Sequence, residues 1–329
     1  ISAALGGAID NLSSGAEIGV INANFYNNYA YNKDGFSQGG AIASASTKDG
    51  DDSQSIHKIT GDFISNYTLS ETNLSEGGAV MNLTSNIKEI KGNFTDNYAL
   101  GGANSHGGAI INNDLGIIGS ITGDFDGNYA ESNGGAAASG GALFNGGNIT
   151  NLTANFSNNH ALTNGTFATG GALANVLGFF PLHGITTLSG NFSNNFAQTT
   201  GAGDDDYALG GAIYNEAKMA IDDIQSSTFS GNYVSGASEN TDGGAVWNAG
   251  TIGFSGKTVF KDNYKIVNGV KTANDIYNSG TVNVAENGSL DISGGISGDG
   301  NGKINLAQNA ELNLNNATSA GNNLTLEKD

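Results

Sequence analysis

Cysteine is absent from the 329 residues of this chain, and proline occurs once, as Pro181. The absence of cysteine excludes a disulfide-stapled scaffold, so packing and backbone hydrogen bonds must hold the fold together. No proline-rich linker or block of charge divides the chain. A single elongated body is therefore the expected organisation.

Arginine is absent as well, and the charge is strongly one-sided. All twelve cationic side chains are lysines, against 31 acidic ones, which gives a formal net charge of -19. Nucleic acid is not an expected partner, because phosphate binding needs a basic face. No run approaches the roughly 18 apolar residues of a membrane helix, so we expect no membrane insertion of this segment. Any signal or membrane anchor is expected to lie outside this sequence.

Glycine is abundant instead, and much of it belongs to two alternating motifs. The first is Gly-Gly-Ala followed by an aliphatic residue, in eight copies: Gly6 to Ile9, Gly39 to Ile42, Gly77 to Val80, Gly107 to Ile110, Gly140 to Leu143, Gly170 to Leu173, Gly210 to Ile213 and Gly243 to Val246. The second is Phe-x-x-Asn, also in eight copies: Phe25/Asn28, Phe63/Asn66, Phe94/Asn97, Phe125/Asn128, Phe156/Asn159, Phe192/Asn195, Phe229/Asn232 and Phe260/Asn263. The phenylalanines recur every 31 residues, with insertions of five to seven residues in some units.

Within each unit the hydrophobic period is 2, as in a β-strand. The segment before the phenylalanine reads aliphatic-x-small-x-Phe, for example Ile121-Gly123-Phe125, which alternation places on one face of one strand. A helix is excluded, because glycine and asparagine at this density would cost roughly 0.5 to 1 kcal/mol per residue. The seventh and eighth units are expected to be less regular, since Gln225 and Gly256 occupy the aliphatic position.

A unit with two or three short strands cannot bury a hydrophobic face alone, but stacked units bury inward side chains between neighbouring copies. The sequence therefore predicts an all-β fold, a right-handed parallel β-helix. Eight rungs of about 31 residues are expected over residues 1–276, and shorter rungs over residues 277–329. The phenylalanines should stack in the core and the asparagines should form an amide ladder. Both motifs are expected to build the fold and not to carry chemistry.

These paired motifs, over residues 6–264, resemble the repeats of the chlamydial polymorphic outer membrane proteins, which are autotransporter adhesins with β-helical passengers. From Tyr277 the shorter alternating runs are similar to generic autotransporter passenger rungs. The chain departs from the chlamydial proteins in having no cysteine, which they commonly carry. The resemblance implies a surface-exposed passenger segment of a bacterial autotransporter-type adhesin. Because of the missing cysteine, we expect its source to be a bacterium outside the chlamydial group.

Three functions from different classes are weighed. The leading hypothesis is a cell-surface adhesin, a rigid rod whose loops bind a receptor or glycan on a host or neighbouring bacterial cell. The second is a structural subunit that stacks end to end into an extracellular filament through open β-edges. The third is a β-helical polysaccharide lyase or hydrolase, but we do not expect an enzyme, because arginine is absent and the acidic clusters fall in different units. The expected location is extracellular, on the bacterial cell surface.

Neither a cofactor nor a metal site is expected. The clusters Asp49/Asp51/Asp52 and Asp204/Asp205/Asp206 carry oxygen ligands of the kind calcium uses, but they lack the periodicity of calcium-binding β-rolls. We interpret them as solvated loops. The histidines lack metal-ligand spacing and are interpreted as surface or turn residues; they are His57, His106, His160 and His183.

Two apolar features are candidate binding sites. The residue after each Gly-Gly-Ala-aliphatic tetrad is placed outward by alternation, and it becomes aromatic along the chain, at Phe144, Tyr214 and Trp247. This stripe is either covered by neighbouring loops or is a partner surface.

The other candidate is an insertion that reads Val176 to His183 and contains Pro181. Proline cannot donate to a strand ladder, so the segment is expected to leave the rung. Its apolar side chains then either pack on the rod's own flank or anchor a partner, and they are Leu177, Phe179, Phe180 and Leu182.

Overall fold

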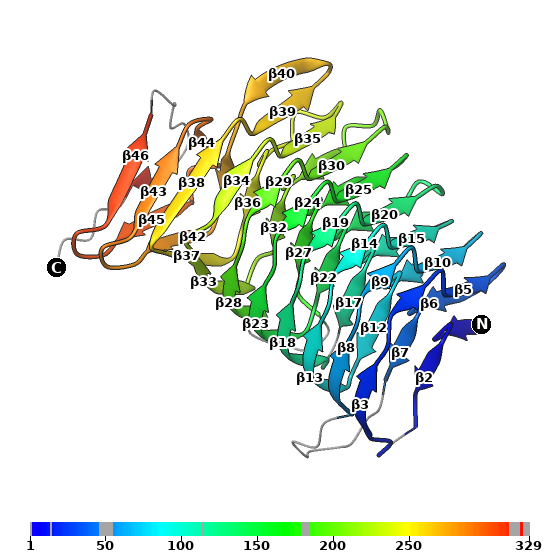
Figure 1. The fold of residues 1–329 in the computed structure, drawn as a ribbon. Helices are drawn as coiled ribbons and strands as arrows, with labels where there is room; N and C mark the ends of the chain where they lie inside the picture. Colours follow the sequence, from blue (N-terminus) through cyan, green and yellow to red (C-terminus); the bar gives the residue numbers. More distant parts are fainter. Residues whose placement is uncertain are drawn as a thin grey trace.

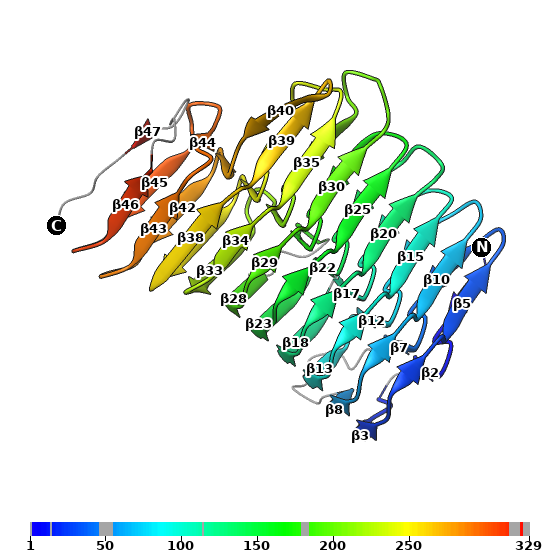
Figure 2. The same ribbon diagram turned by 45° about the horizontal axis from the view of Figure 1, so that its top comes forward.

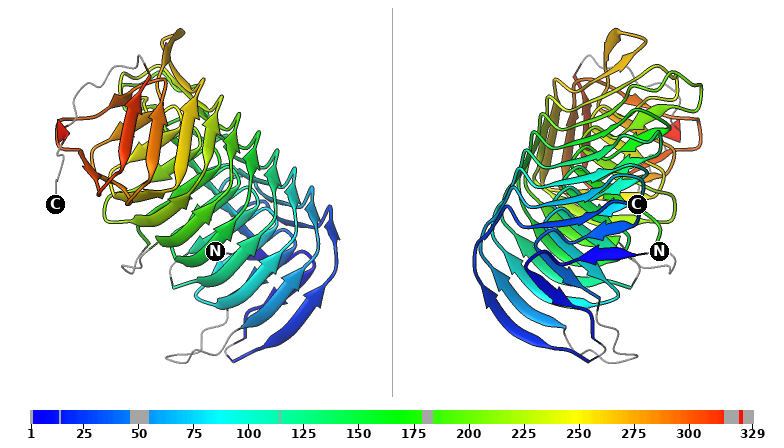
Figure 3. Two further views of the ribbon diagram at one scale, coloured as in Figure 1. Left: turned by 60° about the vertical axis from the view of Figure 1, so that its left-hand side comes forward. Right: turned by 90° about the vertical axis from the view of Figure 1, so that its right-hand side faces the viewer.

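The chain forms a right-handed parallel β-helix, which confirms the predicted fold class. A computed structural model describes residues 2–13, 15–45, 55–113, 115–178, 184–315 and 323–324, and these contain strands but no helix. The chain winds in successive rungs, and each rung hydrogen-bonds to the rungs before and after it (Figures 1 and 3). The described N-terminal and C-terminal strands therefore lie at opposite ends of one rod.

Five sheets run along the rod, and we number them in the order in which a rung crosses them. Sheet 1 contains β1 (Ala3–Leu5), β6 (Phe36–Gln38), β11 (Ser75–Glu76), β16 (Ser105–His106), β21 (Ala138–Ser139), β26 (Phe167–Thr169) and β31 (Tyr207–Leu209). Sheet 2 contains β2 (Ile9–Asn11), β7 (Ile42–Ser44), β12 (Val80–Leu83), β17 (Ile110–Asn113), β22 (Leu143–Asn145), β27 (Leu173–Asn175), β32 (Ile213–Asn215), β36 (Val246–Asn248), β41 (Ile276–Asn278) and β44 (Ile296–Ser297).

Sheets 3 and 4 form the main hydrophobic core together with sheet 2. Sheet 3 contains β3 (Ile18–Asn22), β8 (Ile56–Thr60), β13 (Asn86–Lys91), β18 (Ile117–Thr122), β23 (Asn148–Thr153), β28 (Gly184–Ser189), β33 (Ala220–Gln225), β37 (Thr251–Ser255), β42 (Thr281–Val284), β45 (Lys303–Leu306) and β47 (Asn323–Leu324). Sheet 4 contains β4 (Phe25–Tyr26), β9 (Phe63–Ile64), β14 (Phe94–Thr95), β19 (Phe125–Asp126), β24 (Phe156–Ser157), β29 (Phe192–Ser193), β34 (Thr228–Ser230), β38 (Lys257–Lys261), β43 (Ser289–Ile292) and β46 (Glu311–Leu314).

Sheet 5 completes each full rung, and Figure 2 shows its strands side by side. It contains β5 (Tyr29–Asn32), β10 (Tyr67–Ser70), β15 (Tyr98–Gly101), β20 (Tyr129–Ser132), β25 (His160–Thr163), β30 (Phe196–Thr199), β35 (Tyr233–Gly236), β39 (Tyr264–Val267) and β40 (Val270–Ala273). Among the described strands the pairing is parallel except between β39 and β40, which form an antiparallel hairpin.

The prediction of two or three strands per unit was wrong, because the first seven rungs each cross all five sheets. The aliphatic-x-small-x-Phe segment is not one strand: Ile121 lies in β18 and Phe125 begins β19, in a different sheet. Gly123 lies at the corner between them with a φ of 143°, and a Cβ there would stand 1.9 Å from the Gly92 carbonyl oxygen. The small residue is therefore required by a corner between sheets.

The Gly-Gly-Ala motif makes a second corner, between sheets 1 and 2. Gly107 has a φ of 61°, in the left-handed region, and a Cβ on Gly108 would lie 2.1 Å from the Gly141 carbonyl oxygen of the next rung. Glycine is therefore needed at both positions, once for the backbone angle and once for the close approach of stacked corners.

The phenylalanines form the predicted column in the core. Their rings stack with centroids 4.5–4.9 Å apart from Phe25 to Phe260, and those from Phe63 to Phe260 are fully buried. In the seventh and eighth units, Ile224 and Phe254 fill the aliphatic position, one and two residues earlier than in the other units. A register shift between β33 and β37 accompanies this change, so the predicted irregularity is confirmed.

The asparagines of Phe-x-x-Asn form the predicted ladder. From Asn28 to Asn232, each side-chain amide donates to the side-chain oxygen of the asparagine in the next rung at 2.8–3.0 Å. The last of them, Asn263, donates to the buried carboxylate of Asp275 at 2.8 Å. Burial raises the pKa of Asp275, although Asn263 and two backbone N–H groups, of Ser293 and Gly294, lower it.

A second asparagine ladder, which the sequence analysis missed, follows the Gly-Gly-Ala corner. From Asn82 the amide donations run through successive rungs of sheet 2 at 2.7–2.8 Å, linking Asn82, Asn112, Asn145, Asn175, Asn215, Asn248 and Asn278. The signal was available, because asparagine stands two positions after the aliphatic residue of most tetrads. The regular recurrence of this asparagine in the sequence is enough to predict the second ladder.

The cross-section of the rod changes near its C-terminal end. Sheet 1 stops at β31, and sheet 5 stops at the β39–β40 hairpin, whereas sheets 2, 3 and 4 continue without a break. Within the described residues, the rungs after residue 273 therefore cross three sheets only. The end of sheet 1 at Leu209 positions the candidate site.

Candidate functional site

Sheets 1 and 2 meet at an outwardly concave corner, so that their outward side chains contact each other. The ring of His106, on β16, stacks on Phe144, on β22, with centroids 4.7 Å apart. Its Nδ1 lies 3.2 Å from the Glu76 carboxylate of the preceding rung. We call this concave corner the flank groove.

In the first six rungs the flank groove is filled by the chain's own side chains. A separate hydrophobic cluster occupies it, formed by Ala43, Met81, Ile111, Phe144 and Ala174, with Leu5 of sheet 1 packed against them. Phe144 is only 8% exposed, so it packs inside the groove and offers no partner surface. Its cover includes His106 of sheet 1, because the glycine corner brings the outward faces of the two sheets together.

Where sheet 1 ends, at β31, the flank groove opens into a pocket of about 380 Å³. One wall is a stack of three half-buried rings on sheet 2, with Trp247 lying 4.8 Å from Tyr214 and 5.7 Å from Tyr277. The other wall is Tyr207 and Leu209 of β31 together with Glu239, Asn240 and Asp242. Because sheet 1 ends at β31, no strand of that sheet covers Trp247 and Tyr277.

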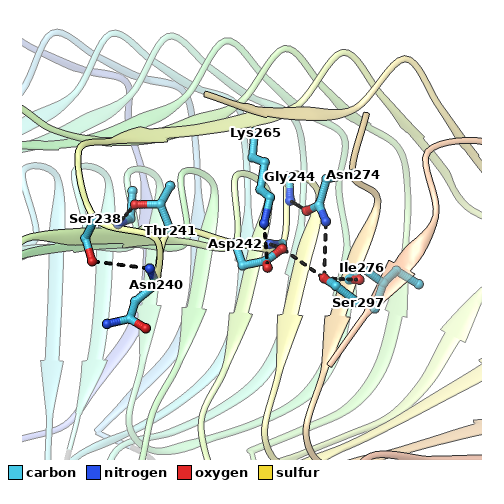
Figure 4. Close-up of polar contacts among 11 residues, drawn as sticks. Ser238, Asn240, Thr241, Asp242, Gly244, Lys265, Asn274, Ile276 and Ser297 are labelled. Atoms are coloured by element: carbon cyan, nitrogen blue, oxygen red, sulfur yellow. Dashed lines mark hydrogen bonds and ion pairs between the residues drawn. The ribbon is translucent and has the colours of Figure 1, made fainter. Parts of the chain in front are cut away.

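A network of polar contacts fixes Asp242 at this pocket (Figure 4). Lys265 Nζ lies 2.8 Å from the Asp242 carboxylate, and both side chains are largely buried. Ser297 Oγ donates to the same carboxylate at 2.9 Å, and the Gly243 N–H donates to it at 2.8 Å. The charge of Asp242 is therefore neutralised internally, and this residue stabilises the pocket wall.

The rim of the pocket is acidic and comes from two neighbouring loops. Glu239 and Asn240 are exposed on the loop that leads to Asp242. Ser238 Oγ donates to the Asp204 carbonyl oxygen at 2.9 Å, which joins this loop to the one that carries the exposed Asp204 and Asp205. The pocket thus combines aromatic walls with a negatively charged rim.

The other predicted binding segment is described only at its start. Leu177 is 39% exposed, and its backbone N–H donates to Glu216 Oε2 at 2.7 Å. Phe179, Phe180, Pro181, Leu182 and His183 lie outside the described residues, as do Asp49, Asp51 and Asp52. A role for this insertion in binding stays a prediction.

The three described histidines lie in different surroundings, and the interpretation as surface or turn residues fits His57 but not His106. His57 is exposed on β8, whereas His106 is largely buried in the flank groove. His160 belongs to an outer aromatic column on sheet 5, between Tyr129 and Phe196 at 5.0 and 4.7 Å. Burial lowers the pKa of His160 from 6.5 to about 4.

The low pKa of His160 predicts that the free energy of unfolding depends on pH. The folded state favours the neutral form of His160. The resulting contribution to the free energy of unfolding is complete above pH 6.5 and is lost as the pH falls from 6.5 to about 4. At 1.36 kcal/mol per pH unit, the loss amounts to at most about 3 kcal/mol. His160→Tyr, which restores the residue most common in the column, should remove this loss. Denaturant unfolding at pH 7 and pH 4 measures it, with His57→Tyr as the exposed control; equal pH slopes for wild type and His160→Tyr would contradict the prediction.

No metal-binding group is evident in the part of the chain that the structure describes, where no three His, Cys, Asp or Glu side chains gather. Within the same residues, no helix is long and apolar enough to cross a membrane. Comparison with known proteins gives no matching family model, no matching curated protein and no matching solved structure. The fold class and the site geometry therefore carry the functional argument.

Of the residues that line the pocket, only Tyr214 and Trp247 were predicted from the sequence as binding residues. Tyr277 had a signal, because Ile276-Tyr277-Asn278 aligns with Val246-Trp247-Asn248 once the Gly-Gly-Ala requirement is dropped. Tyr207 and Glu239 had none, since they lie in the variable segments before the corner.

Proposed function

We propose that this chain is an adhesive segment of a bacterial surface protein, a rod whose open end of the flank groove binds a partner molecule. The observation that carries this proposal is the pocket between Tyr207 and the Tyr214–Trp247–Tyr277 stack. Open aromatic pockets rimmed by polar groups are typical of binding sites in proteins. The resemblance to autotransporter passengers supports the same function and an extracellular location.

The rest of the rod supports a scaffold role. The phenylalanine column and both asparagine ladders are buried and internally satisfied. Their side chains have no capacity left for a ligand, and their stacking holds the rungs in fixed register. A rigid body of this kind presents a surface site with little loss of conformational entropy on binding.

Removal of Trp247 should abolish adhesion. Beads coated with the chain would be tested against a panel of animal and bacterial cells and against a glycan array. We expect Trp247→Ala to reduce retention at least about tenfold, because buried aromatic side chains dominate binding energy. Tyr233→Ala is the matched control, since Tyr233 is also half-buried and stacked between two rings, at 4.9 and 5.0 Å, but on sheet 5. Retention on no cell or glycan, or equal retention of both variants, would refute the proposal.

The filament hypothesis is disfavoured at two sheet edges. The Ala208 N–H of β31 donates to Thr241 Oγ1 at 3.2 Å, and its carbonyl accepts the Asp242 N–H at 3.1 Å, which closes sheet 1. Sheet 5 ends in the short strand β40, which carries Lys271. Closed, short and charged edges oppose further strand addition. Filament formation and polysaccharide cleavage stay predictions that no observation here favours.

A further inference from the structure

We propose that the pocket at the open end of the flank groove takes a cationic side chain, a lysine or arginine of a basic segment on a partner protein. This inference rests on the proposed adhesive function and names the chemistry of its ligand. It follows from the charge of the pocket, the arrangement of its rings and the charge of the whole chain.

The charge of the pocket is negative. Its lining consists of Tyr207, Leu209, Tyr214, Glu239, Asn240, Asp242, Trp247 and Tyr277, and this set holds two carboxylates and no cationic side chain. The neighbouring Lys265 neutralises Asp242 at 2.8 Å, which leaves the exposed Glu239 as the carboxylate that faces a ligand. A partner ammonium or guanidinium at the rim would supply the missing positive charge.

The rings suit the same ligand. Tyr207 stacks on Phe167 at 5.9 Å and is the last aromatic ring of sheet 1, so that no ring of the next rung stacks on its other face. A cation over such a face is attracted by the negative potential of the ring face. The apolar edges of the Trp247 stack can at the same time pack against the aliphatic stem of lysine or arginine.

The surroundings favour a cation over a neutral or acidic ligand. Asp204 and Asp205 stand on the loop that Ser238 joins to the rim, and the chain carries a net charge of -19. The negative electrostatic potential of these groups attracts basic partners and repels acidic ones, and it acts over about one screening length. An acidic glycan would meet Glu239 without a basic group in the pocket to pair with it.

The chain contains its own reporter for this ligand. Trp247 is its single tryptophan, so tryptophan emission reports on the pocket alone. The probe is the pentapeptide Ser-Lys-Gly-Lys-Ser, compared with the same peptide acetylated on both lysines and with Ser-Glu-Gly-Glu-Ser. We expect a saturable change in emission with the lysine peptide only. Raising the salt from 0.1 M to 1 M should weaken this binding, because the screening length falls from about 10 Å to about 3 Å.

Two charge variants test the named carboxylate without removing a ring. Glu239→Gln should weaken binding of the lysine peptide about fivefold or more, as expected for a charge pair at a partly desolvated rim. Glu286→Gln removes another exposed carboxylate in a different region of the chain and should leave binding unchanged. Equal effects of the two variants would mean that the peptide responds to the overall charge, which would overturn the proposal.

The outcomes separate this inference from the proposed function. If the acetylated peptide changes the emission as strongly as the lysine peptide, or if no peptide changes it while Trp247→Ala still abolishes retention on cells, the cationic ligand is refuted and the adhesive pocket stands. If Trp247→Ala leaves retention on cells intact, the adhesive pocket itself is refuted.

Discussion

Phe125→Ala is expected to destabilise the folded rod by about 3 to 5 kcal/mol, as large-to-small changes of buried phenylalanines do. Phe125 is fully buried and stacks between Phe94 and Phe156 at 4.7 and 4.9 Å. Removing the ring opens a cavity that the neighbouring rings cannot fill, because the backbone ladders of sheet 4 fix their spacing.

The effect should also be local. In a solenoid each rung contacts only its neighbours, so the weakened contacts lie between the rungs of Phe94 and Phe156. Hydrogen exchange should quicken in β14, β19 and β24 first, and denaturant unfolding gives the total loss. Leu115→Ala is the control, because Leu115 is 44% exposed and precedes β18 in the rung of Phe125. A loss below about 1 kcal/mol for Phe125→Ala would contradict a packed aromatic core.

Asn128→Asp is expected to be at least as damaging at neutral pH, with a loss of about 3 to 5 kcal/mol. The Asn128 amide donates to the Phe94 carbonyl oxygen and to Asn159 Oδ1, each at 2.9 Å. Its own Oδ1 accepts two N–H groups of Asn97, at 3.0 and 2.9 Å. A carboxylate keeps the two acceptor roles but loses both donors, so a buried charge would face two unpaired oxygens.

The pH dependence of this variant gives a second readout. Burial, together with the two acceptor oxygens of Phe94 and Asn159 that the second carboxylate oxygen would face, raises the pKa of the introduced carboxyl group, so the folded state binds its proton more tightly than the unfolded state does. The deficit relative to wild type is therefore largest above the folded-state pKa and shrinks as the pH falls towards 4. Unfolding at pH 7 and pH 4 measures the change, with the exposed Asn133→Asp as control. A deficit that does not depend on pH would show that the ladder does not require a donor at this position.

Asp275 shows why an acid is tolerated at the end of the same ladder. The Asp275 carboxylate accepts hydrogen bonds from Asn263 at 2.8 Å and from the Ser293 N–H at 3.0 Å, and both contacts require only an acceptor. Inside the ladder each residue must donate as well as accept, which an amide does and a carboxylate cannot do.

The repeat by itself determined the solenoid, its 31-residue period and the two inner columns at Phe125 and Asn128. The reason is that a parallel β-helix places equivalent positions of successive units directly above one another, so a periodic residue becomes a continuous column. The same logic would have predicted the second ladder at Asn112, had that column been followed.

Only the tertiary structure decided the flank groove and its pocket. Alternation places Phe144 and Trp247 on the same outward face of sheet 2, yet the first is 8% exposed and the second lines an open pocket. The difference depends on what stands across the corner: sheet 1 covers Phe144, and it ends at Leu209, before it reaches Trp247. Local periodicity fixes which face of a strand a side chain occupies, whereas burial depends on where a different sheet stops.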